Sequence, residues 1–149
     1  MYLAPCSLSL GLGENHANAL VPLANGVEEI EAVIIIDTLR RATWEVTSAG
    51  IAAQVITASR GVRLMPDAAW NDVKPKSYDV LVVPGGLGGT KRLCETKAVL
   101  DVIKSFHADG KVIAAICAGP LVLQAAGILD GIRVTCHPGV ASDLTVTPQ

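Results

Sequence analysis

A stretch of 18 uncharged residues, 112–129, constrains the fold of this chain more than any other feature. Its length reaches the usual minimum for a membrane-spanning helix. A Gly-Pro pair lies in its middle, however, and would interrupt a single helix. We therefore expect a buried strand over residues 111–116, then a buried helix over residues 119–127, and no membrane segment. Cys117 falls at the junction between the two elements.

The composition agrees with a single layered domain. The chain has 149 residues, which fits one domain with one core. Half of the residues are hydrophobic but only 3% are aromatic, so aliphatic side chains must fill the core. This favours stacked layers of helices and sheet over a disulfide-bonded fold. The net charge is −2 and no basic run occurs, which argues against sequence-specific binding of nucleic acid.

Strands and helices are expected to alternate along the chain. Strands are predicted over residues 18–24, 44–50, 78–86, 111–116 and 132–138, with a pair of short strands over 54–67. Helices are predicted over residues 27–42, 90–110 and 119–127, with a flexible loop over 86–90. This order predicts an open, mostly parallel sheet with helices on both faces. In such sheets the chemistry lies at the carboxyl ends of the strands.

Residues 1–17 are expected to form an N-terminal extension ahead of a domain that covers residues 18–149. The extension lacks a positive n-region and contains helix breakers, so it does not fit a secretory signal. The cysteines show no C-x-x-C spacing and no ligand cluster with the histidines. We expect reduced thiols, a cytoplasmic protein and no bound metal. The four cysteines are Cys6, Cys94, Cys117 and Cys136.

Cys117 is the first candidate for chemistry. It follows a predicted strand and directly precedes a predicted helix, which is the arrangement of a nucleophile elbow. Backbone N–H groups at the start of the helix favour an anion, so we expect them to lower the pKa of the thiol. The alternative is a buried structural cysteine, which is a common core residue.

The turn Pro84-Gly85-Gly86 ends the neighbouring predicted strand. Glycines at this place let the backbone approach the site closely. Their N–H groups could form an anion pocket together with the N–H of Ala118. A plain turn between a strand and a helix explains the same glycines equally well.

Three glutamates begin the first predicted helix. Glu28 and Glu29 fit a solvated face on which acidic side chains compensate the helix dipole. Glu31 lies beside an apolar run and is expected to be partly buried. Burial and a nearby thiolate would both raise the pKa of such a carboxyl, which could then donate a proton.

His137 follows Cys136 in a predicted strand, so the two side chains should point to opposite faces. An ordinary histidine at a strand end is the simpler interpretation. His16 and His107 are expected to be surface residues.

Together these residues resemble the ThiJ/PfpI superfamily, in its parkinsonism-associated deglycase branch. The resemblance runs from about residue 19 to 138 and rests on five motifs in this order: "NGVEEIEAV", "SRGV", "YDVLVVPGG", "AAICAGP" and "TCHP". It implies a flavodoxin-like three-layer α/β/α sandwich, a homodimer and chemistry without a cofactor.

The resemblance also implies roles for individual residues. Cys117 would be the reactive cysteine, Glu31 its protonated carboxyl partner and His137 the nearby histidine. The backbone N–H groups of Gly86 and Ala118 would be oxyanion-type donors. Two family positions near the site or the dimer contact are arginines in this chain, Arg41 and Arg60.

Two departures from the family pattern affect the interpretation. Protease-like relatives carry a histidine directly after the cysteine, whereas this chain has Ala118, which argues against peptidase activity. Relatives also continue past the last residues of this chain. We therefore expect the C-terminal strand and helices of the family to be missing from the domain.

The leading functional interpretation is a cofactor-independent, cysteine-dependent glyoxalase III or deglycase. Cys117 would attack the aldehyde of a 2-oxoaldehyde such as methylglyoxal, and the resemblance adds glycated proteins or nucleotides as substrates. One alternative is a redox sensor or redox-switched chaperone in the response to oxidative stress, which would use the same cysteine. Another is an inactive truncated form.

Overall fold

The computed structural model describes residues 16–51 and 54–146. Its centre is a five-stranded sheet in the order β5-β2-β1-β6-β7, in which every neighbouring pair of strands is parallel. The strands of this sheet are β1 (Asn18–Leu23), β2 (Glu45–Gly50), β5 (Ala68–Ala69), β6 (Val80–Val83) and β7 (Val112–Ala115). The predicted pair of short strands forms a separate antiparallel hairpin of β3 (Ile56–Thr57) and β4 (Arg63–Leu64).

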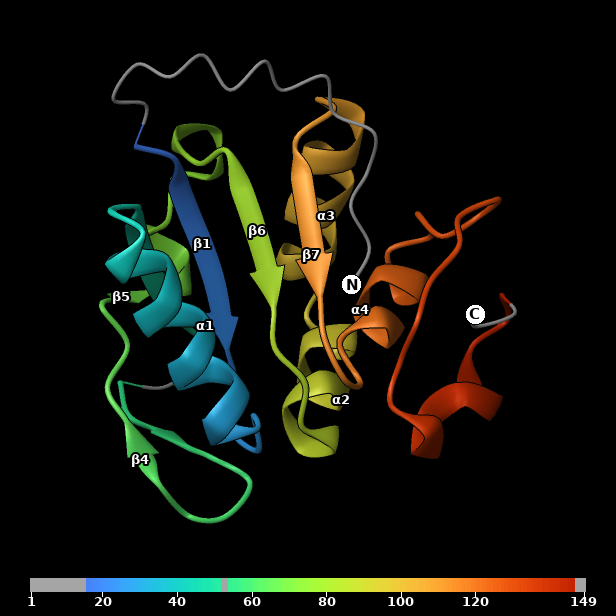
Figure 1. Cartoon of the computed structure of the whole chain (residues 1–149), viewed down its shortest axis with the longest axis horizontal. Coiled ribbons are helices and arrows are strands. Elements are labelled where there is room, and N and C mark those ends of the chain that lie inside the picture. Colours follow the sequence, from blue (N-terminus) through green and yellow to red (C-terminus); the bar gives the residue numbers. More distant parts are fainter. Residues whose placement is uncertain (1–15, 52–53, 147–149) are drawn as a thin grey trace.

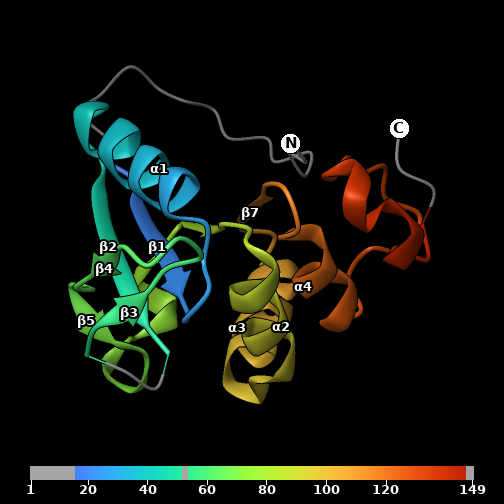
Figure 2. The same ribbon diagram turned by 90° about the horizontal axis from the view of Figure 1, so that it is seen from below.

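Helices cover both faces of the sheet (Figures 1 and 2). One face carries α1 (Glu29–Arg41), and the other carries α2 (Leu87–Glu95), α3 (Lys97–Ala108) and α4 (Pro120–Ala125). Short 3-10 turns occupy Trp70–Asp72, Pro75–Ser77 and Pro138–Asp143. The predicted three-layer α/β/α sandwich with a mostly parallel sheet is confirmed.

The side chains of β1 alternate between two apolar cores. Ala19 and Val21 pack with Ala32 of α1, and all three are fully buried. Leu20 points to the opposite face, into the core that contains Phe106 of α3. A strand covered on both faces needs apolar side chains at every position. This requirement explains why the central strands appear in the sequence as uninterrupted apolar runs.

The 18-residue uncharged stretch divides as predicted into β7, a turn and α4. Across the described ranges of the chain, no helix combines the length and the hydropathy needed to cross a membrane. Residues 1–15 of the predicted N-terminal extension lie outside the described residues, and Cys6 lies among them.

The segments that follow β1, β6 and β7 meet at one rim of the sheet, as predicted. The N–H of Glu28, after β1, donates to the carbonyl of Gly85, after β6, at 3.0 Å. The N–H of Ile116, after β7, donates to the carbonyl of Val83 at 3.2 Å. Backbone hydrogen bonds therefore hold the three segments in fixed relative positions.

The prediction of a flexible loop over residues 86–90 is wrong, because α2 begins at Leu87. Its glycines serve close packing instead of flexibility. A Cβ atom at Gly89 would lie 2.8 Å from Cα of Val27, and one at Gly88 would lie 3.3 Å from Cα of Gly26. The first turn of α2 therefore packs directly against the backbone that follows β1.

The single long helix predicted over residues 90–110 is also wrong, because it consists of α2 and α3. Thr96 separates them with an extended backbone (ψ 96°). Its hydroxyl donates to the carbonyl of Arg92 at 2.7 Å, and its own carbonyl accepts the N–H of Val99 at 2.9 Å. A threonine that bonds to its own helix in this way competes with helix propagation.

The strand predicted over residues 132–138 is absent from the described sheet. The segment packs one side against the core through buried Val134 and half-buried Cys136. Within the described residues, one backbone hydrogen bond joins this segment to the turn after β7. The N–H of His137 donates to the carbonyl of Cys117 at 2.9 Å. The alternation of apolar and polar residues in this segment therefore reflects the burial of one of its sides, without pairing to a strand.

Close packing of α2 predicts different effects for two neighbouring glycines. Gly88→Ala should leave the free energy of unfolding nearly unchanged, since its Cβ is only slightly crowded and alanine favours helix. Gly89→Ala should lower that free energy by about 1–3 kcal/mol despite the same gain in helix propensity. Urea unfolding followed by circular dichroism measures both values. Equal stabilities of the two variants would contradict the packing described here.

Candidate active site

Cys117 lies on a sharp turn between β7 and α4, as the sequence predicts. Its φ of +59° is in the left-handed region, which costs a residue with a side chain roughly 1–2 kcal/mol. The turn is closed by the N–H of Gly119, which donates to the carbonyl of Ile116 at 2.8 Å. A Cβ atom at Gly119 would lie 2.7 Å from the carbonyl oxygen of Val83. The neighbouring strand therefore supports the strained turn, and the thiol is half-buried at the rim.

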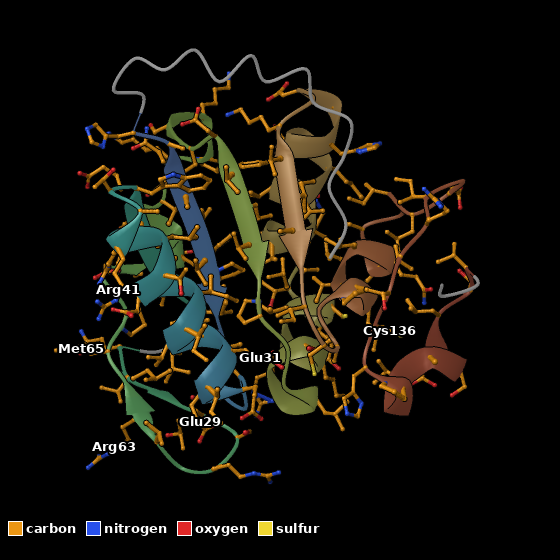
Figure 3. All side chains as sticks on the ribbon, viewed as in Figure 1. Glu29, Glu31, Arg41, Arg63, Met65 and Cys136 are labelled. Carbon is orange, nitrogen blue, oxygen red and sulfur yellow. The ribbon has the colours of Figure 1, made fainter. Side chains whose placement is uncertain are left out.

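Glu31 reaches the same place from the first turn of α1. The residue is half-buried, and its carboxyl group lies close enough to the Cys117 thiol to raise the pKa of that thiol. The N–H of Gly85 donates to Glu31 Oε2 at 2.7 Å. In Figure 3, Glu31 and Cys136 are labelled on either side of the loop that carries Cys117. The predicted partial burial of Glu31 and its approach to the cysteine are thus both observed.

Gly85 is a site residue that sequence reasoning did not single out. A Cβ atom there would lie 2.6 Å from Cβ of Cys117 and 2.8 Å from Glu31 Oε2. The position therefore has no space for a side chain, and its N–H fixes the carboxyl. The Gly-Gly pair was visible in the sequence, but nothing in it indicated which glycine faces Glu31.

The pKa of the Cys117 thiol is raised above its ordinary value, contrary to our prediction. Burial is the largest cause, followed by the hydrogen bond with Glu31 and the charge of its carboxylate. The N–H groups of Gly86 and Ala118 act in the predicted direction and lower the pKa, but they are outweighed. The carboxyl group of Glu31 therefore disfavours a second negative charge on the sulfur beside it.

His137 lies beside this pair. Its ring Nδ1 accepts the N–H of Gly139 at 3.0 Å, so the neutral ring carries its proton on Nε2. The residue is exposed, and its backbone N–H is bonded to the carbonyl of Cys117. A cleft of about 290 Å³ brings the predicted residues together, and it is lined by Glu31, Ala115, Ile116, Cys117, Thr135, Cys136 and His137.

The two predicted arginines do not join this cleft. Arg41 lies at the far end of α1, is largely exposed and forms an ion pair with Asp37 at 2.7 Å (Figure 3). The side chain of Arg60 is exposed in the turn between β3 and β4. A role for either arginine at a dimer contact stays a prediction. His16 and His107 are exposed, as expected.

Glu29 is buried, with only 7% of its surface exposed, so the predicted solvated position is wrong. The hydroxyl of Ser59 donates to its carboxylate at 2.7 Å, and the backbone N–H of Arg60 donates at 2.9 Å. These bonds, chiefly the one from Ser59, lower the pKa of Glu29. They tie the β3–β4 hairpin to the start of α1. This contact could not be predicted from local sequence patterns, because the partners are about thirty positions apart.

A larger cavity of about 740 Å³ lies along the edge of the sheet near β5. Its lining includes Met65, Trp70 and Thr96 but none of the predicted site residues. Volume alone therefore does not identify the site. The smaller cleft is the candidate active site because a thiol, a carboxyl group and an imidazole converge on it.

Comparison with known proteins finds relatives along most of the chain. A family model described as the DJ-1/PfpI family matches residues 17–148. The chain is 48% identical over 123 residues to a Parkinson disease protein 7 homolog of Danio rerio. This alignment covers 81% of this chain and 65% of that protein. It is 41% identical over 118 residues to a glutathione-independent glyoxalase, DJR-1.2, of Caenorhabditis elegans. This alignment covers 79% of this chain and 62% of that protein.

Solved structures agree with the fold. The crystal structure of Drosophila melanogaster DJ-1beta superposes with a TM-score of 0.85 at 39% sequence identity, covering 90% of this chain and 73% of that one. The chain therefore spans between 62% and 73% of the length of these relatives.

The absence of space at Gly85 generates a test of the site. Gly85→Ala should change the rate at which iodoacetamide alkylates Cys117 by at least about tenfold, because the new Cβ displaces both the thiol and Glu31. Peptide mass spectrometry after timed alkylation measures the rate at this cysteine alone. Gly89→Ala is the control, since it should destabilise the fold without any contact with Cys117. Identical alkylation in the wild type and Gly85→Ala would contradict the geometry.

Proposed function

The chain belongs to the DJ-1/PfpI family, and on that premise we propose that it is a cofactor-independent glyoxalase III and deglycase. Its substrates would be 2-oxoaldehydes such as methylglyoxal and the early glycation adducts that they form on proteins or nucleotides. The observation that carries the proposal is the single cleft shared by Cys117, Glu31 and His137. The similarity to a relative named as a glutathione-independent glyoxalase supports it.

The first step is addition of the Cys117 sulfur to the aldehyde carbon. In the proposed reactive state Glu31 is protonated and the sulfur carries the negative charge. The N–H groups of Gly86 and Ala118 lie beside the sulfur and favour that charge. Attack forms the C–S bond and moves the carbonyl electron pair onto oxygen. Glu31 then gives its proton to that oxygen, and the product is a neutral hemithioacetal.

The second step moves a hydrogen between adjacent carbons. The Glu31 carboxylate, now ionised, removes the proton from the carbon attached to sulfur, and the electron pair moves onto the neighbouring ketone oxygen to give an enediolate. The hydroxyl proton of the first carbon passes to that oxygen, and Glu31 returns its proton to the second carbon, which gives a thioester of a 2-hydroxy acid. His137 Nε2–H is suited to hydrogen-bond the oxygen on that carbon. Water then hydrolyses the thioester and releases the hydroxy acid and the thiol.

The size of the cleft supports small substrates. A volume of about 290 Å³ is at the lower end of ligand pockets, which suits a molecule of three or four carbon atoms. His137 is exposed, and Ile116 beside the thiol is 49% exposed. A side chain of a glycated protein can therefore approach the sulfur from solvent.

A redox sensor or redox-switched chaperone is the second candidate. The observation that favours it is the pair of N–H groups beside the sulfur, from Gly86 and Ala118. They would hydrogen-bond the oxygen of a sulfenate or sulfinate as readily as the oxygen of a hemithioacetal. A cytoplasmic location, expected from the reduced cysteines, stays a prediction.

Substitutions at the two reacting groups test the carbonyl chemistry. Cys117→Ser should reduce methylglyoxal consumption to background, because the hydroxyl is not ionised in this setting. Glu31→Gln should lower kcat by about 10²- to 10⁴-fold with little change in KM, because the amide cannot transfer a proton. Loss of the aldehyde and formation of lactate are followed together.

The control for these assays is Cys94→Ala. Cys94 lies in α2 outside the cleft, so its replacement should leave turnover unchanged. Undiminished turnover by Cys117→Ser would refute the proposed mechanism.

We further propose that two copies of the chain pair through α1. Ile30, Val33 and Ile34 form an apolar patch on its outer face, and they are 65%, 48% and 58% exposed. Their spacing places them on one side of the helix. Contiguous apolar side chains on a surface helix typically mark an interaction site. The homodimer that the family resemblance implies supplies the occupant, a second copy of the same patch.

Ile34→Glu should convert the dimer into a monomer, because a carboxylate would be buried without a partner at the interface. Size-exclusion chromatography with light scattering measures the mass. Leu87→Glu is the matched control, since Leu87 is 70% exposed but lies on α2. A wild type that is monomeric at micromolar concentration, or an Ile34→Glu dimer, would contradict pairing through α1.

A further inference from the structure

The candidate active site contains a second thiol that the carbonyl chemistry does not use. Cys136 lines the same cleft as Cys117 and is likewise half-buried. The third cysteine of the described residues, Cys94, lies in α2 and does not line the cleft. Two reduced thiols at one small cleft provide the groups for a disulfide bond.

The backbone places the two cysteines close together. The peptide N–H that follows Cys136 donates to the carbonyl of Cys117 itself, at 2.9 Å. The Cα atom of Cys136 is two covalent bonds from the nitrogen of that N–H, so the two cysteines lie on backbone segments in direct contact. Disulfide bonds join Cα atoms that are about 4.4–6.8 Å apart. A backbone contact this close to both residues favours a bond between them.

The segment that carries Cys136 takes no part in the described sheet. Within the described part of the chain, residues 133–136 form no backbone–backbone hydrogen bond and belong to no strand or helix. Their attachment to the rim is the hydrogen bond made by the N–H of His137. The sulfur atoms can therefore reach bonding geometry without breaking any ladder of the sheet.

From these observations we infer that Cys136 is a resolving cysteine, which forms a reversible intramolecular disulfide with Cys117 after a hydroperoxide has oxidised Cys117. This modification goes beyond the proposed glyoxalase function and does not depend on it. It competes with carbonyl chemistry for the same sulfur, so the disulfide form would be inactive toward aldehydes until a thiol reductant restores it.

The chemistry proceeds in two balanced steps. The Cys117 thiolate attacks one oxygen of the hydroperoxide, the O–O bond breaks, and Cys117 becomes a sulfenic acid. The other oxygen takes up the proton that the thiol had lost and leaves as an alcohol or water. The Cys136 sulfur then attacks the Cys117 sulfur, the S–O bond breaks, and the hydroxide leaves as water with the proton of Cys136. The hydroperoxide gains two electrons and the two thiols lose them.

The sequence makes the test direct, because trypsin separates the two cysteines. Cleavage after Lys111 and Arg133 places Cys117 in the peptide 112–133 and Cys136 in the peptide 134–149. After mild hydrogen peroxide and alkylation, non-reduced digests of the wild type should contain these two peptides joined by a disulfide. The linked pair should disappear after dithiothreitol and should be absent from Cys136→Ser.

Loss of the resolving thiol should also redirect the oxidation. Cys136→Ser should accumulate at least about fivefold more sulfinate on Cys117 than the wild type, because the sulfenic acid then awaits a second peroxide. Cys94→Ala is the matched control and should behave as the wild type. Equal rates of Cys117 alkylation before peroxide treatment establish that Cys136→Ser keeps the site intact.

Three results would overturn the inference. The first is equal sulfinate in the wild type and Cys136→Ser with no linked peptide. The second is a disulfide that joins Cys117 to Cys94 as readily as to Cys136. The third is a linked pair found only in a species of twice the chain mass on a non-reducing gel, which would place the bond between two copies.

Discussion

The hydrogen bond from the Gly85 N–H to Glu31 is the contact on which the candidate site depends. It joins the turn after β6 to the first turn of α1, at the point where Cys117 approaches from β7. A side chain at Gly85 would occupy the space of both the thiol and the carboxyl. Three segments distant in the sequence can meet here only because one residue has no Cβ. The strained φ of Cys117 is held by the same close packing.

Much of the fold could be predicted, because parallel strands buried on both faces leave a direct mark on the sequence. The strands around β1 and β6, the helix α1 and the turn at Cys117 follow from apolar runs and their breaks. The errors share a physical cause, which is that local patterns do not report tertiary partners. The glycines near Gly88 look flexible until the backbone of Gly26 is placed against them. The alternation around Val134 indicates one buried side and says nothing of strand pairing.

The residues of the site could be predicted from the sequence, but the pKa of its thiol could not. Cys117, Glu31 and His137 were found from motifs, and they do share one cleft. The pKa of the thiol was expected to fall, and the opposite direction follows from burial and the approach of Glu31. Neither the burial of the thiol nor its distance from Glu31 can be obtained from the spacing of residues along the chain. The buried Glu29 shows the same limit, since its burial depends on the distant hairpin and Ser59.

The raised thiol pKa changes how reactivity at this site has to be understood. A cysteine activated only by backbone N–H groups would be ionised whatever its neighbours do. In the proposed mechanism Glu31 carries a proton when the sulfur attacks, because a charged carboxylate beside the sulfur would disfavour a second negative charge. An aldehyde uses that proton when its oxygen becomes negative, whereas a peroxide takes the electrons of the sulfur without needing Glu31 as an acid. The partner of the sulfur after oxidation must then come from elsewhere in the cleft, and Cys136 lies there directly before His137, whose N–H donates to the carbonyl of Cys117.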